Sequence, residues 1–219
     1  MRILCLSDIH GEAAGLSDIV SAAASDTDLV VIAGDVTHLG GGPEAEAVLA
    51  PVLSLGLPVL AVGGNADREG VRQYLDARGI NLHARGVVTG SVGFMGLGGG
   101  TRSPFGTPWE LEDAEASQCL AAGHAQIAGA AYKVLVSHAP PRNTKLDRNL
   151  TRMHVGSGPV REFLLSGSVQ LCLCGHIHEA WGEERVGAVL CINIGPYKSG
   201  RYALVTIDDG RVSVTWRKR

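Results

Sequence analysis

The sequence predicts an α/β fold in which two packed β-sheets carry helices on their outer faces. In the first half, short continuous apolar runs of strand length alternate with Ala- and Leu-rich segments of helical spacing. Such runs fit strands buried on both faces, and strand–helix–strand alternation implies parallel strands joined by right-handed crossovers. The last part of the chain is rich in strands. At 219 residues, 45% hydrophobic and 19% charged, the chain fits a single globular domain spanning residues 1–219.

The predicted elements of the first half follow one another in a regular order. Strands are expected at Arg2–Leu6, Leu29–Ala33 and Pro58–Val62, and helices at Glu12–Ala24, Pro43–Leu55 and Arg68–Ala77. Pro43 fits the first turn of a helix, where no backbone N–H is needed. Gly56 fits a helix end, because glycine adopts the left-handed conformation found there.

From residue 80 onward the chain changes to shorter strands, fewer helices and two irregular stretches, 98–108 and 140–158. Strands are expected at Arg85–Thr89, Val92–Leu97, Tyr132–Ser137, Val169–Cys174, Ala188–Ile192, Tyr202–Ile207 and Arg211–Trp216. Helices are expected at Glu110–Ala122 and Val160–Leu165. Asp208-Asp209-Gly210 predicts a turn that joins the last two strands into a hairpin. Long irregular loops inside compact domains are usually functional, so the stretch 140–158 is a candidate for a site loop.

Seven polar side chains follow the ends of five predicted strands. They are Asp8, His10, Asp35, Asn65, His138, His176 and His178. In open α/β sheets, ligand-binding groups collect beyond the carboxyl ends of the strands. Asp8 and His10 are two residues apart, as are His176 and His178, so on extended backbone the members of each pair point to one side. We expect the seven side chains to lie close together.

These side chains form a mixed donor set of two carboxylates, one amide oxygen and four imidazoles. The set suits Mn²⁺, Fe, Zn²⁺ or Ni²⁺ better than Cu(I) or an iron–sulfur cluster. Seven ligands are too many for one ion, so we predict two divalent metal ions that share Asp35 as a bridge. A water held between two such ions becomes hydroxide near neutral pH and can attack a phosphoryl group in line.

The order of these motifs resembles the signature of the calcineurin-like metallophosphoesterases. The motifs are Asp8-x-His10, Gly34-Asp35, Gly64-Asn65, Ser137-His138 and Gly175-His176-x-His178. Longer phrases resemble the predicted phosphoesterases related to the Icc cyclic-nucleotide phosphodiesterase: Asn81–His83, Pro104–Pro108, Ser137–Pro141, His154–Ser157 and Leu173–Glu179. The resemblance implies a four-layer αββα sandwich with two mixed sheets flanked by helices. It also implies one metal bound by Asp8, His10, Asp35 and His178, and another bound by Asp35, Asn65, His138 and His176.

The chain departs from this family in one motif. The family commonly has histidine after Gly-Asn, followed by Asp or Glu, whereas this chain has Ala66 and Asp67. In the family, that histidine contacts the substrate phosphate and can protonate the leaving group. General-acid help is worth roughly 10²–10⁴-fold, and the methyl group of Ala66 cannot supply it. The departure therefore favours phosphodiesters over monoesters with poor leaving groups. We expect Asp67, without its usual partner, to be solvated.

Three further residues are candidates for contact with the substrate. We hypothesise that His154 or Arg142, from the long loop after His138, reaches over the metals and takes part of the missing histidine's role. The alternative is a capped turn with no catalytic part. His38 lies three residues after Asp35, so it either contacts the substrate or is solvated. The predicted catalytic residues are Asp8, His10, Asp35, Asn65, His138 and His154, and the predicted substrate-binding residues are Asn65, His38 and Arg142.

We therefore predict a dinuclear metal-dependent phosphoesterase that hydrolyses phosphodiesters by attack of a metal-bridging hydroxide. Cyclic nucleotides, nucleic-acid ends and other small diesters all fit as substrates. The alternative function is a metal-binding, phosphoesterase-like scaffold that acts as a protein-interaction or regulatory subunit with weak catalysis. Ala66 favours this alternative, and the presence of all seven ligands argues against it.

The composition limits which binding partners and which cellular compartment we expect. The net charge of −3 gives no basic footprint, so we expect no general nucleic-acid binding and no binding to anionic membranes. Four of the five cysteines lie in apolar runs and the number is odd, which predicts reduced thiols and a cytoplasmic protein. The N-terminal apolar run is too short for a signal peptide, and no stretch approaches the roughly 18 apolar residues of a membrane span. The apolar C-terminal hairpin offers an edge for a homodimer.

Overall fold

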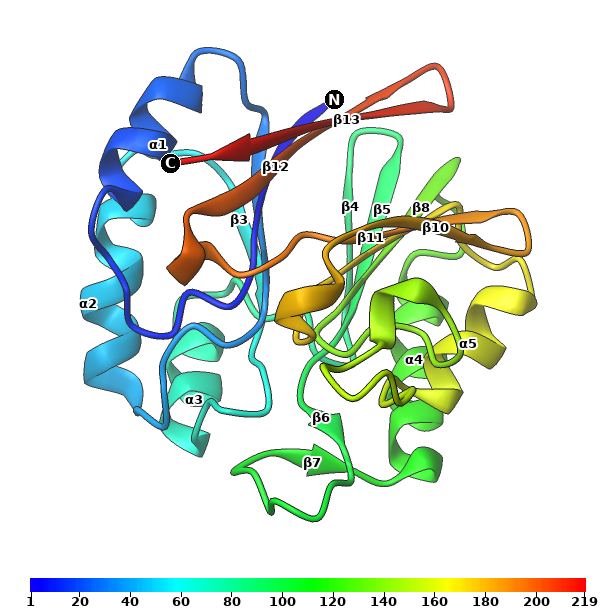
Figure 1. The fold of residues 1–219 in the computed structure, drawn as a ribbon. Helices are drawn as coiled ribbons and strands as arrows, with labels where there is room; N and C mark the ends of the chain where they lie inside the picture. Colours follow the sequence, from blue (N-terminus) through cyan, green and yellow to red (C-terminus); the bar gives the residue numbers. More distant parts are fainter.

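Two β-sheets packed face to face form the centre of the computed structural model, which describes residues 1–219 (Figure 1). The strands are β1 (Arg2–Leu6), β2 (Leu29–Ala33), β3 (Val59–Val62), β4 (Gly86–Thr89), β5 (Val92–Leu97), β6 (Gly100–Thr101), β7 (Glu110–Leu111), β8 (Tyr132–Ser137), β9 (Leu171–Cys174), β10 (Gly182–Val186), β11 (Val189–Asn193), β12 (Arg201–Asp208) and β13 (Arg211–Lys218). The α-helices are α1 (Leu16–Ala24), α2 (Gly42–Leu53), α3 (Glu69–Ala77), α4 (Asp113–Gln126) and α5 (Gly158–Leu165), and the short 3₁₀ turns are η1 (Lys145–Asp147), η2 (His178–Ala180) and η3 (Tyr197–Ser199). None of the helices has the length and hydrophobicity that crossing a bilayer requires.

Both large sheets are mixed. The first has the order β13-β12-β1-β2-β3, in which β1, β2 and β3 are parallel and β12 joins β1 antiparallel. The second has the order β10-β11-β9-β8-β5-β4, in which the four central strands are parallel and both edge strands are antiparallel. The predicted hairpin is present, because β12 pairs with β13 across the turn at Asp209 and Gly210. The C-terminal hairpin thus completes the sheet that the N-terminus begins.

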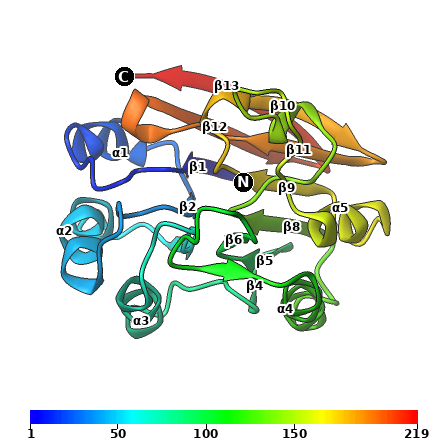
Figure 2. The ribbon, with the colours of Figure 1, turned by 60° about the horizontal axis from the view of Figure 1, so that its bottom comes forward.

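The molecule has four layers, with helices on the outer face of each sheet (Figure 2). Helices α1, α2 and α3 pack on the first sheet, and α4 and α5 pack on the second. Strand β2 shows why its sequence is apolar throughout. Val31 and Ala33 face the other sheet, whereas Val30 and Ile32 face the helices. Every side chain of this strand therefore lies in a core, and the predicted α/β class and αββα layering are confirmed.

The main differences from the predicted elements are two later helix starts and one strand that was not predicted. Helix α1 begins at Leu16 rather than Glu12, because Gly15 has a φ angle of 68°, which a right-handed helix cannot contain. Residues 110–111 form β7, which pairs with β6, so α4 starts later than expected. Strand β10 was not predicted, because its sequence GEERV lacks an apolar pattern at the edge of the sheet.

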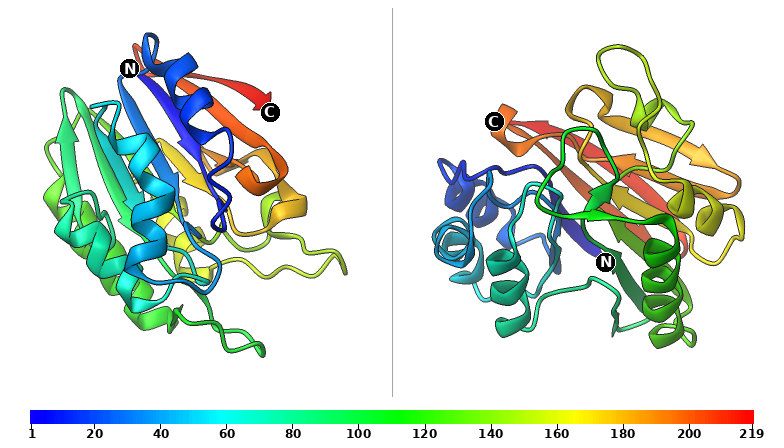
Figure 3. Two further views of the ribbon diagram at one scale, coloured as in Figure 1. Left: turned by 90° about the vertical axis from the view of Figure 1, so that its left-hand side faces the viewer. Right: turned by 90° about the horizontal axis from the view of Figure 1, so that it is seen from below.

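The parallel strands end at one common rim of the sandwich, opposite the N-terminal methionine. The loops that follow β1, β2, β3, β8 and β9 make this rim. The two irregular stretches, around residues 105 and 150, project from the same end of the molecule (Figure 3). This geometry concentrates the predicted site residues in one place.

Candidate metal centre

Six of the seven predicted ligands form two compact groups at this rim. Asp8, His10 and His178 form one group, and Asp35, His138 and His176 form the other; within each group the ligand atoms lie within 4.8 Å of one another. Each group combines ligands that follow a strand of the first sheet with ligands that follow strands of the second. The metal centre therefore spans the junction between the two sheets.

The first group converges on one point. The Nε2 atoms of His10 and His178 are 3.2 Å apart, and His178 Nε2 is 3.3 Å from Asp8 Oδ1. His10 Nε2 is 3.9 Å from the same carboxylate oxygen. Two imidazole nitrogens and a carboxylate directed at one another are a favourable ligand set for a divalent ion.

The second group includes Asn65, the seventh predicted ligand. Asn65 Oδ1 lies 3.0 Å from His138 Nε2, and Asp35 Oδ1 lies 3.5 Å from the same nitrogen. His138 Nδ1 donates a hydrogen bond of 2.9 Å to the Ala33 carbonyl, so in the neutral ring Nε2 carries the lone pair that a metal needs. The rings of His138 and His176 meet edge to face with centroids 4.9 Å apart.

Asp35 lies between the two groups. Its Oδ2 is 3.5 Å from His10 Nε2, and its Oδ1 is 3.5 Å from His138 Nε2. The Ala66 backbone N–H donates to Oδ1 at 2.9 Å and fixes the orientation of the carboxylate. One carboxylate thus presents one oxygen to each group, which is the geometry of a bridging ligand.

The backbone at the site is held in uncommon conformations. The φ angles of Asp8, His10, Asp35 and His176 lie between 49° and 69°, a region that non-glycine residues seldom occupy. Hydrogen bonds between the first two loops hold these turns: the N–H groups of Asp8 and His10 donate to the carbonyls of Gly34 and Asp35 at 3.0 and 2.9 Å. Such strain of about 1–3 kcal/mol per residue persists where surrounding structure over-determines it, as at ligand sites.

Glycines in the motifs leave room for the ligands. A Cβ at Gly34 would overlap the His138 ring, and a Cβ at Gly64 would overlap the Asp35 carboxylate. A Cβ at Gly175 would overlap the Ser7 hydroxyl. The glycines directly before Asp35, Asn65 and His176 are therefore a packing requirement of the centre.

The comparisons with known proteins agree with this geometry. Residues 1–180 match the family described as calcineurin-like phosphoesterase. The chain belongs to the calcineurin-like phosphoesterase family. Uncharacterized protein MJ1162 of Methanocaldococcus jannaschii is 32% identical over 203 residues, which cover 90% of this chain and 88% of that protein.

Solved structures share the fold of this metallophosphoesterase. TT1561 of Thermus thermophilus superposes with a TM-score of 0.78 at 18% identity, covering 98% of this chain and 97% of that one. A dimetal phosphatase from Danio rerio superposes with a TM-score of 0.73 at 14% identity, covering 100% of this chain and 96% of that one. The predicted family and fold are thus confirmed, and family membership makes the chain a phosphoric ester hydrolase by class.

The electrostatics of the centre suit cations. Burial raises the pKa of Asp8 and of Asp35, but the neighbouring histidines lower it more, so both carboxyls are ionised. Burial lowers the pKa of His138, yet the charge of Asp35 and its hydrogen bond raise it to about 9. Burial and the charge of His138 lower the pKa of His176 to about 4. A proton on His138 therefore balances the buried carboxylates in the metal-free protein, and metal binding must displace it.

Asp67 is buried, so the expectation that it is solvated is wrong. Its carboxylate accepts hydrogen bonds from the Gly64 N–H at 2.8 Å, the Thr37 N–H and hydroxyl at 2.8 Å each, and the Val36 N–H at 3.1 Å. Burial and the charge of Asp35 raise the pKa of Asp67 to about 6. Through these hydrogen bonds, the Asp67 carboxylate holds together the loops that carry Asp35 and Asn65.

The three candidate substrate residues lie in different surroundings. The exposed ring of His38 meets the His10 ring edge to face, with centroids 5.5 Å apart. His154 Nδ1 lies 2.7 Å from Oδ1 of the buried Asp147, which also accepts N–H groups of its own loop. This matches the alternative of a capped turn, and neither ligand group contains His154. Arg142 is exposed. Catalytic or substrate-binding roles for His154 and Arg142 remain predictions.

Sequence reasoning missed two residues at the rim. Asn193, at the end of β11, is buried; its Nδ2 donates to the carbonyls of Ile177 at 2.9 Å and Leu146 at 3.2 Å, which positions the turn that carries His178. The backbone N–H of Lys198 donates to the Asp8 carbonyl at 3.3 Å. A polar residue at the end of an apolar run, the signal used for the metal ligands, would have identified Asn193.

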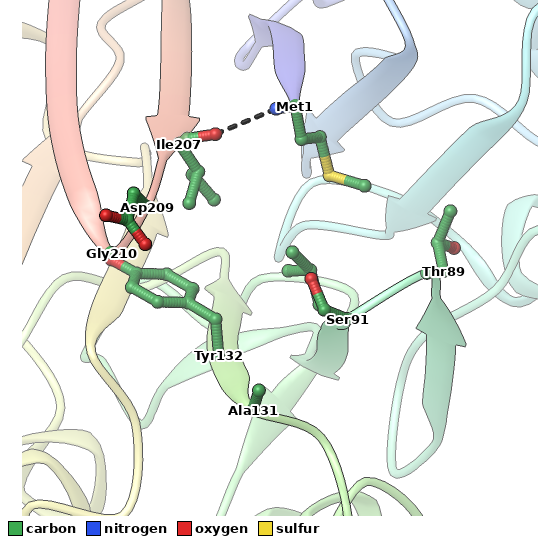
Figure 4. A pocket seen from close by; sticks show the side chains of 10 residues that line it. Met1, Thr89, Ser91, Ala131, Tyr132, Ile207, Asp209 and Gly210 are labelled. Atoms are coloured by element: carbon green, nitrogen blue, oxygen red, sulfur yellow. Dashed lines mark hydrogen bonds between the residues drawn. The ribbon is translucent and has the colours of Figure 1, made fainter.

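A cavity of about 390 Å³ lies at the other end of the sandwich (Figure 4). Met1, Ser91, Tyr132 and Asp209 are among its lining residues, and the Met1 ammonium donates to the Ile207 carbonyl at 2.7 Å. No group of metal-ligating side chains lines it. The chemistry of this family therefore belongs to the opposite rim.

Proposed function

We propose that this metallophosphoesterase is a dinuclear metal-dependent phosphodiesterase acting on small substrates. The position of Asp35 carries the proposal, because its two oxygens face two separate ligand groups. Asp8, His10, Asp35 and His178 would hold one divalent ion, and Asp35, Asn65, His138 and His176 would hold the other. When bound, two such ions supply Lewis acidity and an acidified water for attack on phosphorus.

The chain's own residues prepare this chemistry. Ser7 donates to Asp8 Oδ2 at 2.6 Å, and the His176 N–H donates to both oxygens of the same carboxylate at 3.0 and 3.2 Å. The Ala33 carbonyl fixes the His138 tautomer. These contacts hold the ligands in place before any metal arrives, which reduces the reorganisation that binding requires.

The preference for diesters rests on position 66. Ala66 is buried, and its N–H is used by Asp35 Oδ1. No acid at this position can protonate a poor alkoxide leaving group, so substrates with stable leaving groups are favoured. Aryl diesters meet this condition; cyclic nucleotides and other small diesters fit the proposal as diesters, not through their leaving groups.

Other expectations remain part of the proposal. Residues 1–219 are proposed as one domain, supported by the pairing of β12 with β1. All five cysteines are free thiols, which supports a cytoplasmic location. Mn²⁺, Fe, Zn²⁺ and Ni²⁺ all fit the donor set. Homodimerisation through the C-terminal hairpin stays a prediction.

The test compares bis(p-nitrophenyl) phosphate with p-nitrophenyl phosphate over a panel of divalent metals, with metal content measured in parallel. We expect two metals per chain, a higher kcat/KM for the diester, and loss of both metal and activity in Asp35→Asn. Asp26→Asn is the matched control, because Asp26 is exposed and forms only a surface ion pair with Arg2. The proposal fails if the metal-loaded protein cleaves no diester and Asp35→Asn changes neither measurement.

The second candidate is a binding scaffold with weak catalysis. The large apolar side chains Phe105 and Leu150, at the tips of the two rim loops, are 87% and 86% exposed, which favours a surface for a partner. Metal binding without turnover on any ester of the panel would support this candidate instead.

A further inference from the structure

The C-terminal segment contributes to the rim of the metal centre although it lies beyond the residues matched by the family, 1–180. Turn η3 lies along the backbone that follows β1: the N–H groups of Tyr197 and Lys198 donate to the carbonyls of Ser7 and Asp8 at 2.8 and 3.3 Å. The Tyr197 hydroxyl donates to the Ala14 carbonyl at 2.9 Å. In Figure 1 this orange turn before β12 lies beside the dark blue loop after β1. Lys198 is thereby fixed next to a predicted metal ligand.

The side chain of Lys198 is a free cation at this position. It is exposed, and it takes part in none of the ion pairs of the structure. The backbone N–H of Lys198 donates to the carbonyl of the predicted ligand Asp8 at 3.3 Å, so the side chain projects from a position next to the centre. An unpaired ammonium beside a metal centre is suited to bind an anionic oxygen.

His38 approaches the same imidazole from another loop. Its ring is exposed and lies edge-on to His10 at 5.5 Å. The loop is fixed by a hydrogen bond of 3.1 Å from the Leu39 N–H to the Ala66 carbonyl and one of 3.2 Å from the Gly40 N–H to the Thr37 hydroxyl. His38 is therefore tied to the backbone of the position where the family carries its histidine.

We propose that Lys198 and His38 form a phosphate-binding subsite on the exposed side of His10, and that they hold the substrate in a way that the methyl group of Ala66 cannot. Lys198 contributes a positive charge, and His38 contributes an imidazole N–H donor to a non-bridging phosphoryl oxygen. The inference rests on the proposed function for its choice of substrate. A subsite with one full charge suits a diester, which carries one negative charge.

The test separates binding from turnover. Lys198→Ala, Lys198→Gln, His38→Ala and His38→Gln are compared with wild type on bis(p-nitrophenyl) phosphate, and the Kd of inorganic phosphate for the metal-loaded proteins is measured by calorimetry. Lys133→Ala is the matched control, because it removes the same charge near the amino end of β8, away from the rim. Metal content is measured for every variant.

We expect both Lys198 variants to raise KM and the phosphate Kd by about tenfold, with little change in kcat and two metals retained. His38→Ala should raise both constants less, and His38→Gln, which keeps an N–H donor, should restore them in part. The proposal is overturned if the Lys198 and His38 variants bind phosphate within twofold of wild type, or if Lys198→Ala loses metal. If wild type cleaves no diester, the proposed function fails, and the phosphate Kd values still decide this subsite.

Discussion

Replacing Gly34 by alanine tests whether the glycine of the Gly-Asp motif makes room for the second ligand group. Gly34 has a φ angle of 93°, and a Cβ there would overlap the His138 ring near Nδ1. That nitrogen donates to the Ala33 carbonyl, so moving the ring breaks the bond that sets its tautomer. The substitution should therefore reduce both stability and metal binding.

The expected magnitude has two parts. Forcing a residue with a side chain into left-handed backbone costs about 1–2 kcal/mol. Overpacking against a ring that is fully buried adds about 1–3 kcal/mol. Gly34→Ala should thus lower the free energy of unfolding of the metal-free protein by about 2–5 kcal/mol, and it should weaken binding of the second metal.

Substitutions at two other glycines separate the backbone cost from the overpacking cost. Gly56 has a φ angle of 69°, and a Cβ there would meet nothing within 4 Å, so Gly56→Ala reports the backbone cost alone, about 1–2 kcal/mol. Gly129 has ordinary backbone and open space, so Gly129→Ala should be neutral or slightly stabilising. The assay is urea denaturation in EDTA, followed by metal titration. The reasoning is refuted if Gly34→Ala is no less stable than Gly56→Ala and still binds two metals.

Three further predictions concern the buried polar groups and the metals. Asp67→Asn leaves at least two of four donors without an acceptor, so the free energy of unfolding should fall by about 1–3 kcal/mol, whereas exposed Asp26→Asn should change it by under about 0.5 kcal/mol. Burial, aided by the charge of Arg72, lowers the pKa of His83 to about 4. The stability that neutral His83 provides is present above about pH 6.5 and is lost as pH falls toward 4, by at most about 3 kcal/mol. His83→Gln should flatten urea midpoints between pH 7 and 4.5, and equal slopes would contradict this. Removing metal with EDTA should lower Tm, and added Mn²⁺ should restore it; an unchanged Tm would count against metal binding by the folded state.

The sequence predicted the layers and the ligand groups because both follow from local patterns. A strand such as β2 is apolar throughout because its alternate side chains, Val30 and Val31, enter two different cores. The ligands follow such strands directly, so their positions at the carboxyl rim follow from the parallel order. Turn residues and the ends of apolar strands were therefore enough to predict most of the fold and most of the metal centre.

The features that were missed depend on contacts between distant segments. Asp67 is buried because donors from the loop after β2 surround it, 30 and 31 residues away in sequence. Lys198 meets the centre through the backbone of Asp8, and β10 exists because β11 pairs with it. None of these contacts produces a periodic pattern of apolar residues or a turn motif in the local sequence. A prediction based on such patterns therefore cannot find them.

The division of ligands between the two sheets links folding to metal binding. Asp8 and Asp35 follow strands of the first sheet, and their histidine partners His178 and His138 follow strands of the second. In the metal-free protein these contacts hold buried carboxylates near a single histidine whose pKa is raised to about 9. An ion in the second ligand group would replace this proton with a fixed charge shared by both sheets. The rim therefore joins the two sheets through its ligands, and the buried interface behind it is packed with apolar side chains.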